Sequence, residues 1–203
     1  MTERGMIFNG EMVRALLDGR KTQTRRPVKF PVIDKNIGCE LAGNELAGEL
    51  AAGNYWNCPF GKPGDHIWVR ETWARYNIDQ DSHDMAYRAT TPEDWPKEGR
   101  WRPSIHMPRW ASRILLEITN IGVQRLSSIS QADAAREGLV RLPATGRYCL
   151  NQGDQYFGGA SHDAREVFSW LWESIYGEES WQANPWVWVI EFKRIEGDDH
   201  ATD

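Results

Sequence analysis

The chain has 203 residues and a formal net charge of -5, so it is long enough to bury roughly 70% of the unfolded surface and too acidic to coat nucleic acid indiscriminately. Its three cysteines are widely spaced and odd in number, which argues against a disulfide framework or a zinc knuckle. No segment resembles a signal peptide and no apolar run approaches the ~18 residues of a spanning helix, so we expect a soluble, cytoplasmic protein with no membrane partner.

The amino-terminal region predicts a strand, a helix and a second strand. Residues 6–8 are typical of a short strand, and Asn9 can cap a helix that continues to Asp18. Apolar residues at helical spacing mark the buried side of this helix: Met12, Val13, Leu16 and Leu17. Gly19 ends the helix, and residues 22–28 are then extended.

The second half of the chain supplies most of the predicted sheet. Residues 66–73 alternate as a strand, and we expect residues 84–89 to pair with it. Residues 113–125 predict a long strand, 164–176 a helix and 186–195 the last strand. This order implies an α+β fold, with a mixed and mostly antiparallel sheet that closes toward a small barrel.

A short helix precedes the last third of the chain. Ser130 is its predicted cap, with Asp133 three residues later as in a capping box. Glu137 is its final residue, and Gly138 lies just past its end.

We predict one domain over residues 1–197 and a disordered acidic tail over residues 198–203. Long loop insertions are expected at about residues 30–62, 75–110 and 140–162.

The segment 19–26 concentrates polar chemistry without a single acid. It holds one amine, two hydroxyls and three guanidiniums: Lys21, Thr22, Thr24, Arg20, Arg25 and Arg26. A lysine among fixed cations loses its proton more easily, and the same cations attract a phosphate. The alternative interpretation is a solvated basic strand that follows a helix end.

Tryptophan and arginine alternate in a proline-bearing segment. Trp95, Trp101 and Trp110 lie among Arg100, Arg102 and Arg109. Flat rings beside guanidiniums can stack unpaired bases. Alternatively, these rings hold an irregular loop on the core.

The glycine, lysine, threonine and arginine of the basic segment resemble the signature of the ASCH family of PUA-like barrels, here Gly19, Lys21, Thr24 and Arg26. The threonine variant is similar to small bacterial N4-acetylcytidine amidohydrolases, whose catalytic set is a lysine, a threonine and a glutamate. Their glutamate follows a Leu-x-x-Leu-[ST]-x-x-x-Ala run, matched by Leu126, Ile129, Ser130 and Ala134 before Glu137. The longer form also resembles uncharacterised, often prophage-encoded ASCH proteins.

This resemblance implies a small PUA-like mixed barrel with flanking helices, and it implies Lys21, Thr24 and Glu137 as catalytic residues. Thr24 would attack an acyl carbonyl, Lys21 would take its proton, and Glu137, at a helix end that disfavours a carboxylate, would donate one. Expected substrate-binding residues are Arg20, Arg25, Arg26, Glu71, Trp101 and Arg102. In a regular strand, however, Lys21 and Thr24 would point to opposite faces, which leaves Thr22 as the alternative hydroxyl.

The expected function is therefore a hydrolase that removes an acyl group from the exocyclic amine of a modified cytidine, as a nucleoside or within RNA. An RNA-binding PUA-like module and an ASCH-type ribonuclease are the alternatives. No cofactor is expected. No metal is expected either, since the histidines are scattered without ligand spacing.

Overall fold

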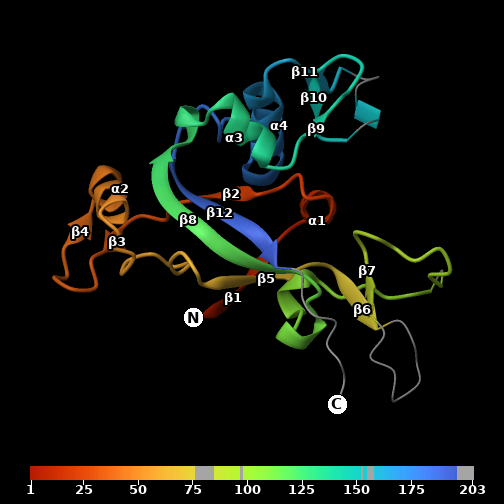
Figure 1. The fold of residues 1–203 in the computed structure, drawn as a ribbon, viewed down its shortest axis with the longest axis horizontal. Coiled ribbons are helices and arrows are strands. Elements are labelled where there is room, and N and C mark those ends of the chain that lie inside the picture. The colour runs from red at the N-terminus through yellow and green to blue at the C-terminus, as the bar shows by residue number, and fades with distance from the viewer. Residues whose placement is uncertain (76–84, 97, 152, 155–157, 196–203) are drawn as a thin grey trace.

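The computed structural model describes residues 1–75, 85–96, 98–151, 153–154 and 158–195 (Figure 1). The predicted tail at 198–203 lies outside these residues, as does part of the insertion predicted at 75–110.

A five-stranded sheet forms the centre, in the order β1-β5-β8-β12-β2. The strands are β1 (Glu3–Ile7), β5 (His66–Arg70), β8 (Leu115–Arg125), β12 (Trp186–Ile195) and β2 (Gln23–Pro27). Only β1 and β5 run parallel; the other neighbours are antiparallel. The α+β class and the mostly antiparallel sheet are confirmed.

The sheet does not close into a barrel within the described residues, contrary to the expectation. Its edge strands β1 and β2 share no ladder, and they are linked instead by a side chain. Arg26 Nη2 of β2 donates to the Ile7 carbonyl oxygen of β1 at 2.6 Å, and its guanidinium lies 5.4 Å from the Phe8 ring centre. The gap between β1 and β2 is too wide for backbone hydrogen bonds, and the long Arg26 side chain spans it.

The two faces of the sheet bury separate cores. Trp188, Ile190 and Phe192 of β12 face the larger core, which α1 (Gly10–Leu17) and α2 (Gly43–Ala51) help to cover. Val187 faces the smaller core under α3 (Gln131–Arg136) and α4 (Ala164–Tyr176). Figure 1 shows α3 and α4 together on one side of the sheet. The period-2 alternation of a strand thus divides the buried residues of β12 between the two cores.

Helix caps form as the sequence predicts. The Asn9 side chain accepts from Met12 N at 2.8 Å, and the Ser130 hydroxyl accepts from Asp133 N at 3.0 Å and donates to its carboxylate at 2.7 Å. Glu137 is the C-cap of α3. These hydrogen bonds satisfy backbone amides of the first helical turn, which have no acceptor within the helix.

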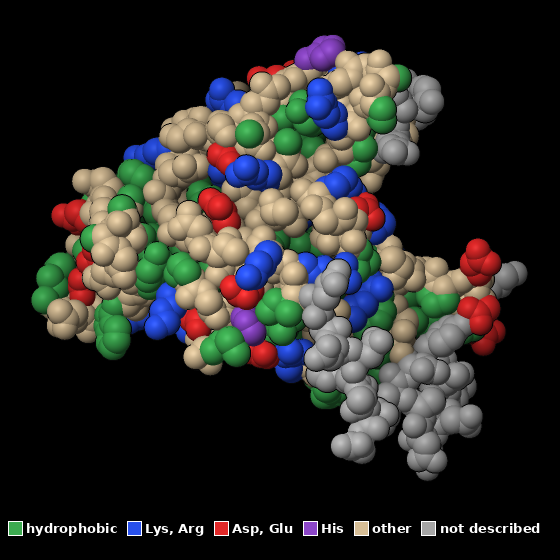
Figure 2. Space-filling view, viewed as in Figure 1, with side chains coloured by type: hydrophobic (Ala, Val, Ile, Leu, Met, Phe, Trp, Pro, Cys, Tyr) green, Lys and Arg blue, Asp and Glu red, His purple; other side chains and the backbone are tan. Residues whose placement is uncertain are grey.

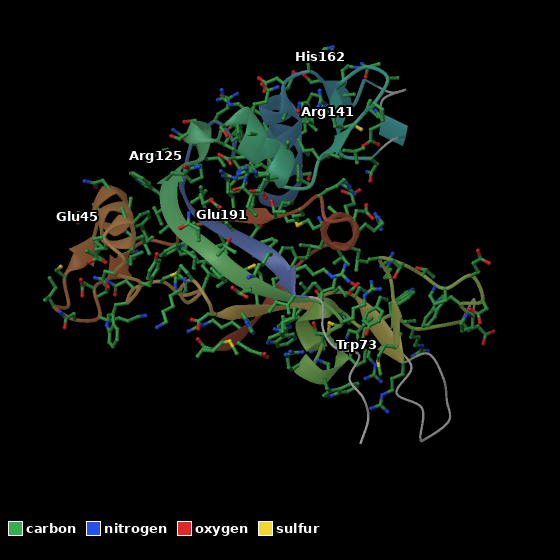
Figure 3. All side chains as sticks on the ribbon, in the orientation of Figure 1. Glu45, Trp73, Arg125, Arg141, His162 and Glu191 are labelled. Carbon is green, nitrogen blue, oxygen red and sulfur yellow. The ribbon has the colours of Figure 1, made fainter. Side chains whose placement is uncertain are left out.

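The predicted loop insertions contain short strands and helices. Residues 30–62 hold α2 and a two-stranded hairpin of β3 (Val32–Ile33) and β4 (Glu40–Leu41). The second insertion pairs β6 (Trp73–Arg75) with β7 (Met85–Tyr87) and holds two short 3-10 turns, Ser104–His106 and Arg109–Ala111. The third forms a small sheet of β9 (Val140–Arg141), β10 (Tyr148–Cys149) and β11 (Ala160–Ser161). Figure 3 marks their separate positions by Glu45, Trp73 and Arg141.

Candidate functional site

Lys21 and Glu137 meet at the junction of the central sheet and α3. Lys21 Nζ donates to Glu137 Oε2 and to the Glu137 carbonyl oxygen, at 2.9 Å in both cases. The side chains are 0% and 2% exposed, so the pair is closed to bulk solvent. The structure therefore brings together two of the three residues implied as catalytic.

Backbone pairing holds this contact in place. Lys21 and Glu137 form an isolated antiparallel bridge, and Thr22 N donates to the Arg136 carbonyl oxygen at 3.0 Å. Gly138 follows with a φ of 111°, a conformation that side chains rarely adopt, and a Cβ there would lie 2.8 Å from Ala15 Cβ. Glycine after α3 thus lets the chain turn close against α1 and return alongside Lys21.

The next residues on the same side of β2 also face α3. Arg25 Nη1 donates to Glu137 Oε1 at 2.8 Å, and Gln23 Nε2 donates to the Asp133 carbonyl oxygen at 2.6 Å. Both oxygens of Glu137 consequently have a cationic donor. The Glu137 side chain therefore does not lie at a bare helix end: it returns to the sheet and contacts two cationic side chains there.

Burial is the main influence on the Lys21 amine. It lowers the pKa of Lys21, the Glu137 carboxylate acts in the opposite direction, and the Arg26 and Arg25 guanidiniums lower the pKa further. The sequence reading attributed the lowering to neighbouring arginines, including Arg20; the larger cause is the loss of water around the amine.

Thr24 lies on the opposite face of β2 from this pair. It pairs in register with Ile190, and Arg26 pairs with Trp188, and both partners belong to the larger core. The register runs without a bulge from Pro27 to Gln23. Strand alternation therefore puts Thr24 with Ile190 and separates it from Glu137 by the sheet itself. Thr22, the alternative hydroxyl, is exposed.

Arg20 lies beside the pair, at the wall of a groove of about 910 Å³. Its Nη1 donates to the Gly138 carbonyl oxygen, and its Nη2 pairs with Asp18 at 2.8 Å. Four arginines line this groove: Arg14, Arg20, Arg136 and Arg141. The acids among its described lining residues are Glu11 and Asp18, so the groove carries an excess of positive charge. We call it the arginine groove.

A small cavity of about 20 Å³ lies against Glu137 and Gly138. Three of its lining residues, Glu11, Leu139 and Leu150, also line the arginine groove. A space of this size corresponds to about one water molecule. The arginine groove and the small cavity against Glu137 therefore share part of their walls.

The other predicted binding residues lie elsewhere. Glu71 is buried, and its two oxygens accept from Arg113 at 2.9 and 3.0 Å; it lines a separate pocket of about 540 Å³ with Arg14 and Arg88. The structure does not bring Glu71 to the Lys21–Glu137 pair.

Trp101 and Arg102 belong to the second insertion. Trp101 stacks on Trp95 with ring centres 4.2 Å apart, and the Arg102 guanidinium lies 5.2 Å from the Trp73 ring centre. One face of each ring is thereby occupied within the protein, which favours the alternative that these rings hold the loop. Figure 3 shows Trp73 well away from α3.

The sequence reading missed several residues of this region: Gln23, Asp133, Arg14, Arg136, Arg141 and Tyr148. Gln23 could have been found, because it alternates with Lys21 and Arg25 at the spacing of one strand face. Arg141 and Tyr148 could not, since the small sheet that places them lies in a predicted loop.

Within the described residues, no helix is long and apolar enough to cross a membrane, and no cluster of three or more His, Cys, Asp or Glu side chains could hold a metal ion.

No family model matches the chain, and no curated protein matches it. Among solved structures, it is similar to the crystal structure of protein EF3133 from Enterococcus faecalis V583, described with the family-model name DUF984. The identity is 8%, the match covers 100% of this chain and 86% of that chain, and the TM-score is 0.40. A TM-score this low does not establish a shared fold.

Proposed function

We propose that the protein hydrolyses the acyl amide on the exocyclic amine of a modified cytidine, of the N4-acetylcytidine type. The observation that carries this proposal is the contact of Lys21 Nζ with Glu137 Oε2 at 2.9 Å. The two residues are 116 positions apart, and the resemblance to the amidohydrolases pairs them from sequence alone. The PUA-like relationship behind that pairing is part of the proposal.

The arrangement favours water, rather than Thr24, as the nucleophile. Thr24 is on the far face of β2, whereas a water-sized cavity adjoins Glu137. In the proposed reaction the water oxygen attacks the acyl carbonyl carbon and Glu137 takes the water proton. The carbon–nitrogen bond then breaks, and that proton passes to the departing amine, which leaves cytidine and a carboxylic acid.

Lys21 supplies the charge for this reaction. A donor fixed in a water-poor site stabilises a developing oxyanion more strongly than it would in bulk water. Arg25 keeps the Glu137 carboxylate oriented between steps through its 2.8 Å contact.

Substrate access requires the turn after α3 to move. Gly138 is held by Arg20, and Glu137 is 2% exposed, so a nucleoside in the arginine groove reaches the carboxylate only when this turn shifts. The arginines of the groove attract the phosphates of an RNA substrate.

The test is conversion of N4-acetylcytidine by the purified protein, followed by chromatography of the nucleosides. We expect cytidine and acetate from the wild type and none from Glu137→Gln or Lys21→Met, with circular dichroism to show that both variants fold. Absence of cytidine with the free nucleoside and with an acetylated RNA, while a positive-control enzyme converts the nucleoside, contradicts the proposal.

The second candidate is an RNA-binding module without catalysis. The complete burial of the Lys21–Glu137 pair favours it, because an ion pair with all its partners inside the protein can serve as structure alone. RNA binding that persists in Lys21→Met while no deacylation is seen supports this candidate. Cleaved fragments of a labelled RNA indicate the ribonuclease instead.

A further inference from the structure

Another cavity, of about 730 Å³, lies at the other end of β2 and shares no lining residue with the arginine groove. Four segments that are far apart in the sequence form it: the end of β2 with residues 28–35, the turn at residues 57–60, the end of α4, and the start of β12. Its volume falls in the range of small-molecule sites in proteins. We call it the insertion pocket, because residues 30–62 supply much of its wall.

The insertion pocket carries charge of one sign. Arg26, Lys29 and Lys35 line it, and no Asp or Glu is among its described lining residues. Lys29 and Lys35 are exposed, and Lys35 Nζ donates to the Trp56 carbonyl oxygen at 2.9 Å, which holds its ammonium group in place beside the pocket. On a chain whose net charge is -5, a pocket with three cations and no acid selects for an anionic ligand.

The rest of the wall is apolar and aromatic. Phe60, Tyr176 and Trp188 line the cavity, together with three prolines. Phe60 packs edge-on against Trp188, with ring centres 5.9 Å apart, and Tyr176 contacts Trp172 at 4.3 Å. Packing of this kind fixes the rings, and fixed rings accept a planar ligand at low entropic cost.

Hydrophobic side chains also reach the surface around this pocket. Figure 2 shows them over α2 and the β3–β4 hairpin. Phe30 and Ile33 are 44% and 50% exposed. Aromatic and cationic groups without acids form the kind of surface that holds a nucleotide by stacking and by its phosphate.

The pocket offers little to read the edge of a base. Asn57 has the one carboxamide among the described lining residues, and both of its ends are engaged: Oδ1 accepts from Lys35 N at 3.0 Å and Nδ2 donates to Glu49 at 3.1 Å. Recognition by stacking and charge alone tolerates any base.

We infer that the insertion pocket binds a nucleotide, with the base against the aromatic wall and the phosphate at Lys29 and Lys35, without selection among bases. The same chemistry occurs in a free mononucleotide and in one nucleotide of a single-stranded RNA. The geometry assigns Arg26 to this pocket rather than to the Lys21–Glu137 site, since Arg26 and Glu137 lie on opposite faces of β2.

The test is a titration of the full chain with AMP, UMP, adenosine, ribose 5-phosphate and octanoate. Tryptophan fluorescence and calorimetry measure the binding. We expect AMP and UMP to bind within about threefold of each other. Adenosine, which lacks the phosphate, and ribose 5-phosphate, which lacks the base, each bind at least about tenfold more weakly than AMP. No saturable binding of AMP overturns the inference, as does tighter binding of octanoate than of AMP.

Variants locate the site. Lys29→Gln and Lys35→Gln change exposed side chains and weaken AMP but not adenosine, whereas Tyr176→Ala and Phe60→Leu weaken both. Lys193→Gln, an exposed cation that is not among the residues lining the insertion pocket, leaves AMP binding unchanged. AMP binding that all four pocket variants leave intact places the nucleotide elsewhere and overturns the inference.

An oligouridylate of eight nucleotides distinguishes the two possible ligands, a free mononucleotide and one nucleotide of a single-stranded RNA. If the oligouridylate binds more tightly than UMP, and Lys29→Gln and Tyr176→Ala weaken its binding, the pocket is assigned to RNA. If the oligouridylate and UMP bind equally, the pocket is assigned to free nucleotides. Deacylation of N4-acetylcytidine is measured in the same variants, so the failure of this inference is distinguishable from the failure of the proposed function.

Discussion

Lys21 donates to both the side-chain and the backbone carbonyl oxygen of Glu137. The amine therefore holds both the Glu137 carboxylate and the backbone at the end of α3. Arg25 completes the cluster from the same face of β2. Two cations and one carboxylate are buried here, and removing any member changes the balance of charge inside the protein.

The carboxylate is the member whose loss costs most. Glu137→Gln leaves Lys21 buried without a counter-charge and leaves Arg25 only the longer contact with Asp133 at 4.0 Å, and we expect it to reduce the free energy of unfolding by about 3–5 kcal/mol. Lys21→Met leaves the Arg25–Glu137 pair intact and costs less. Urea unfolding followed by circular dichroism measures both values; an equal or larger loss in Lys21→Met contradicts this account of the cluster.

Thr24→Val separates the two possible nucleophiles. If water attacks the substrate, the variant keeps deacylation within about threefold of the wild type, which is less than about 1 kcal/mol in activation free energy. A loss of a thousandfold or more with an unchanged unfolding midpoint would return Thr24 to the reaction. Turnover of N4-acetylcytidine is the measurement, and Thr22→Val is measured beside it, because Thr22 carries the alternative hydroxyl and is exposed.

The arginine groove predicts salt-dependent binding of RNA. Arg141→Gln removes one exposed cation, so affinity falls for all sequences alike and the slope of log affinity against log salt decreases by about one. Lys193→Gln is the control, since Lys193 is exposed, pairs with Glu117 at 3.1 Å and is not among the residues that line the groove. Equal slopes in wild type and Arg141→Gln would exclude the groove as the contact surface.

Two glycines of α2 should respond in opposite directions to alanine. A Cβ at Gly43 would lie 2.3 Å from the Trp186 ring, so Gly43→Ala forces α2 away from β12 and costs about 1–3 kcal/mol. Gly48 has no atom within 4 Å of the added Cβ and lies in the same helix, and Gly48→Ala stabilises it by about 0.5–1 kcal/mol. Thermal unfolding of both variants checks the docking of the insertion; a neutral Gly43→Ala would contradict it.

Asp65 predicts a loss of stability in acid. Burial raises the pKa of its carboxyl, but the Thr2 amide at 2.8 Å, the Lys62 amide at 3.2 Å and the nearby positive amino terminus more than offset this, and the pKa is lowered from 3.8. A lowered folded-state pKa means that the unfolded chain binds the proton more readily. The contribution to stability is therefore complete above about pH 4 and is lost as the pH falls through the folded-state value.

Asp65→Asn tests this directly. The difference in urea midpoint between wild type and variant should be constant from pH 5 to 7 and should shrink below about pH 4. A difference that stays constant down to pH 2.5 would show that the charge of Asp65 contributes nothing. Glu117→Gln, at a partly exposed surface pair, is the comparison.

The sequence by itself determined the local elements and one long-range contact. Helix caps at Asn9 and Ser130, helical spacing in α4 and alternation in β12 depend on neighbours in the chain, so α4 and β12 end at the residues that the patterns predict. The resemblance around Lys21 and Glu137 led us to expect that the two residues meet, and their side chains lie 2.9 Å apart.

Only the tertiary structure decided which side of the sheet each site residue faces. Alternation alone indicates that Lys21 and Thr24 point to opposite faces, but only the register of β2 against β12 shows that Thr24 faces the larger core. The same register takes Arg26 to the insertion pocket and Arg25 to Glu137. Adjacent side chains of a strand point to opposite faces, so a cluster of polar residues in the sequence is divided between two sites in space.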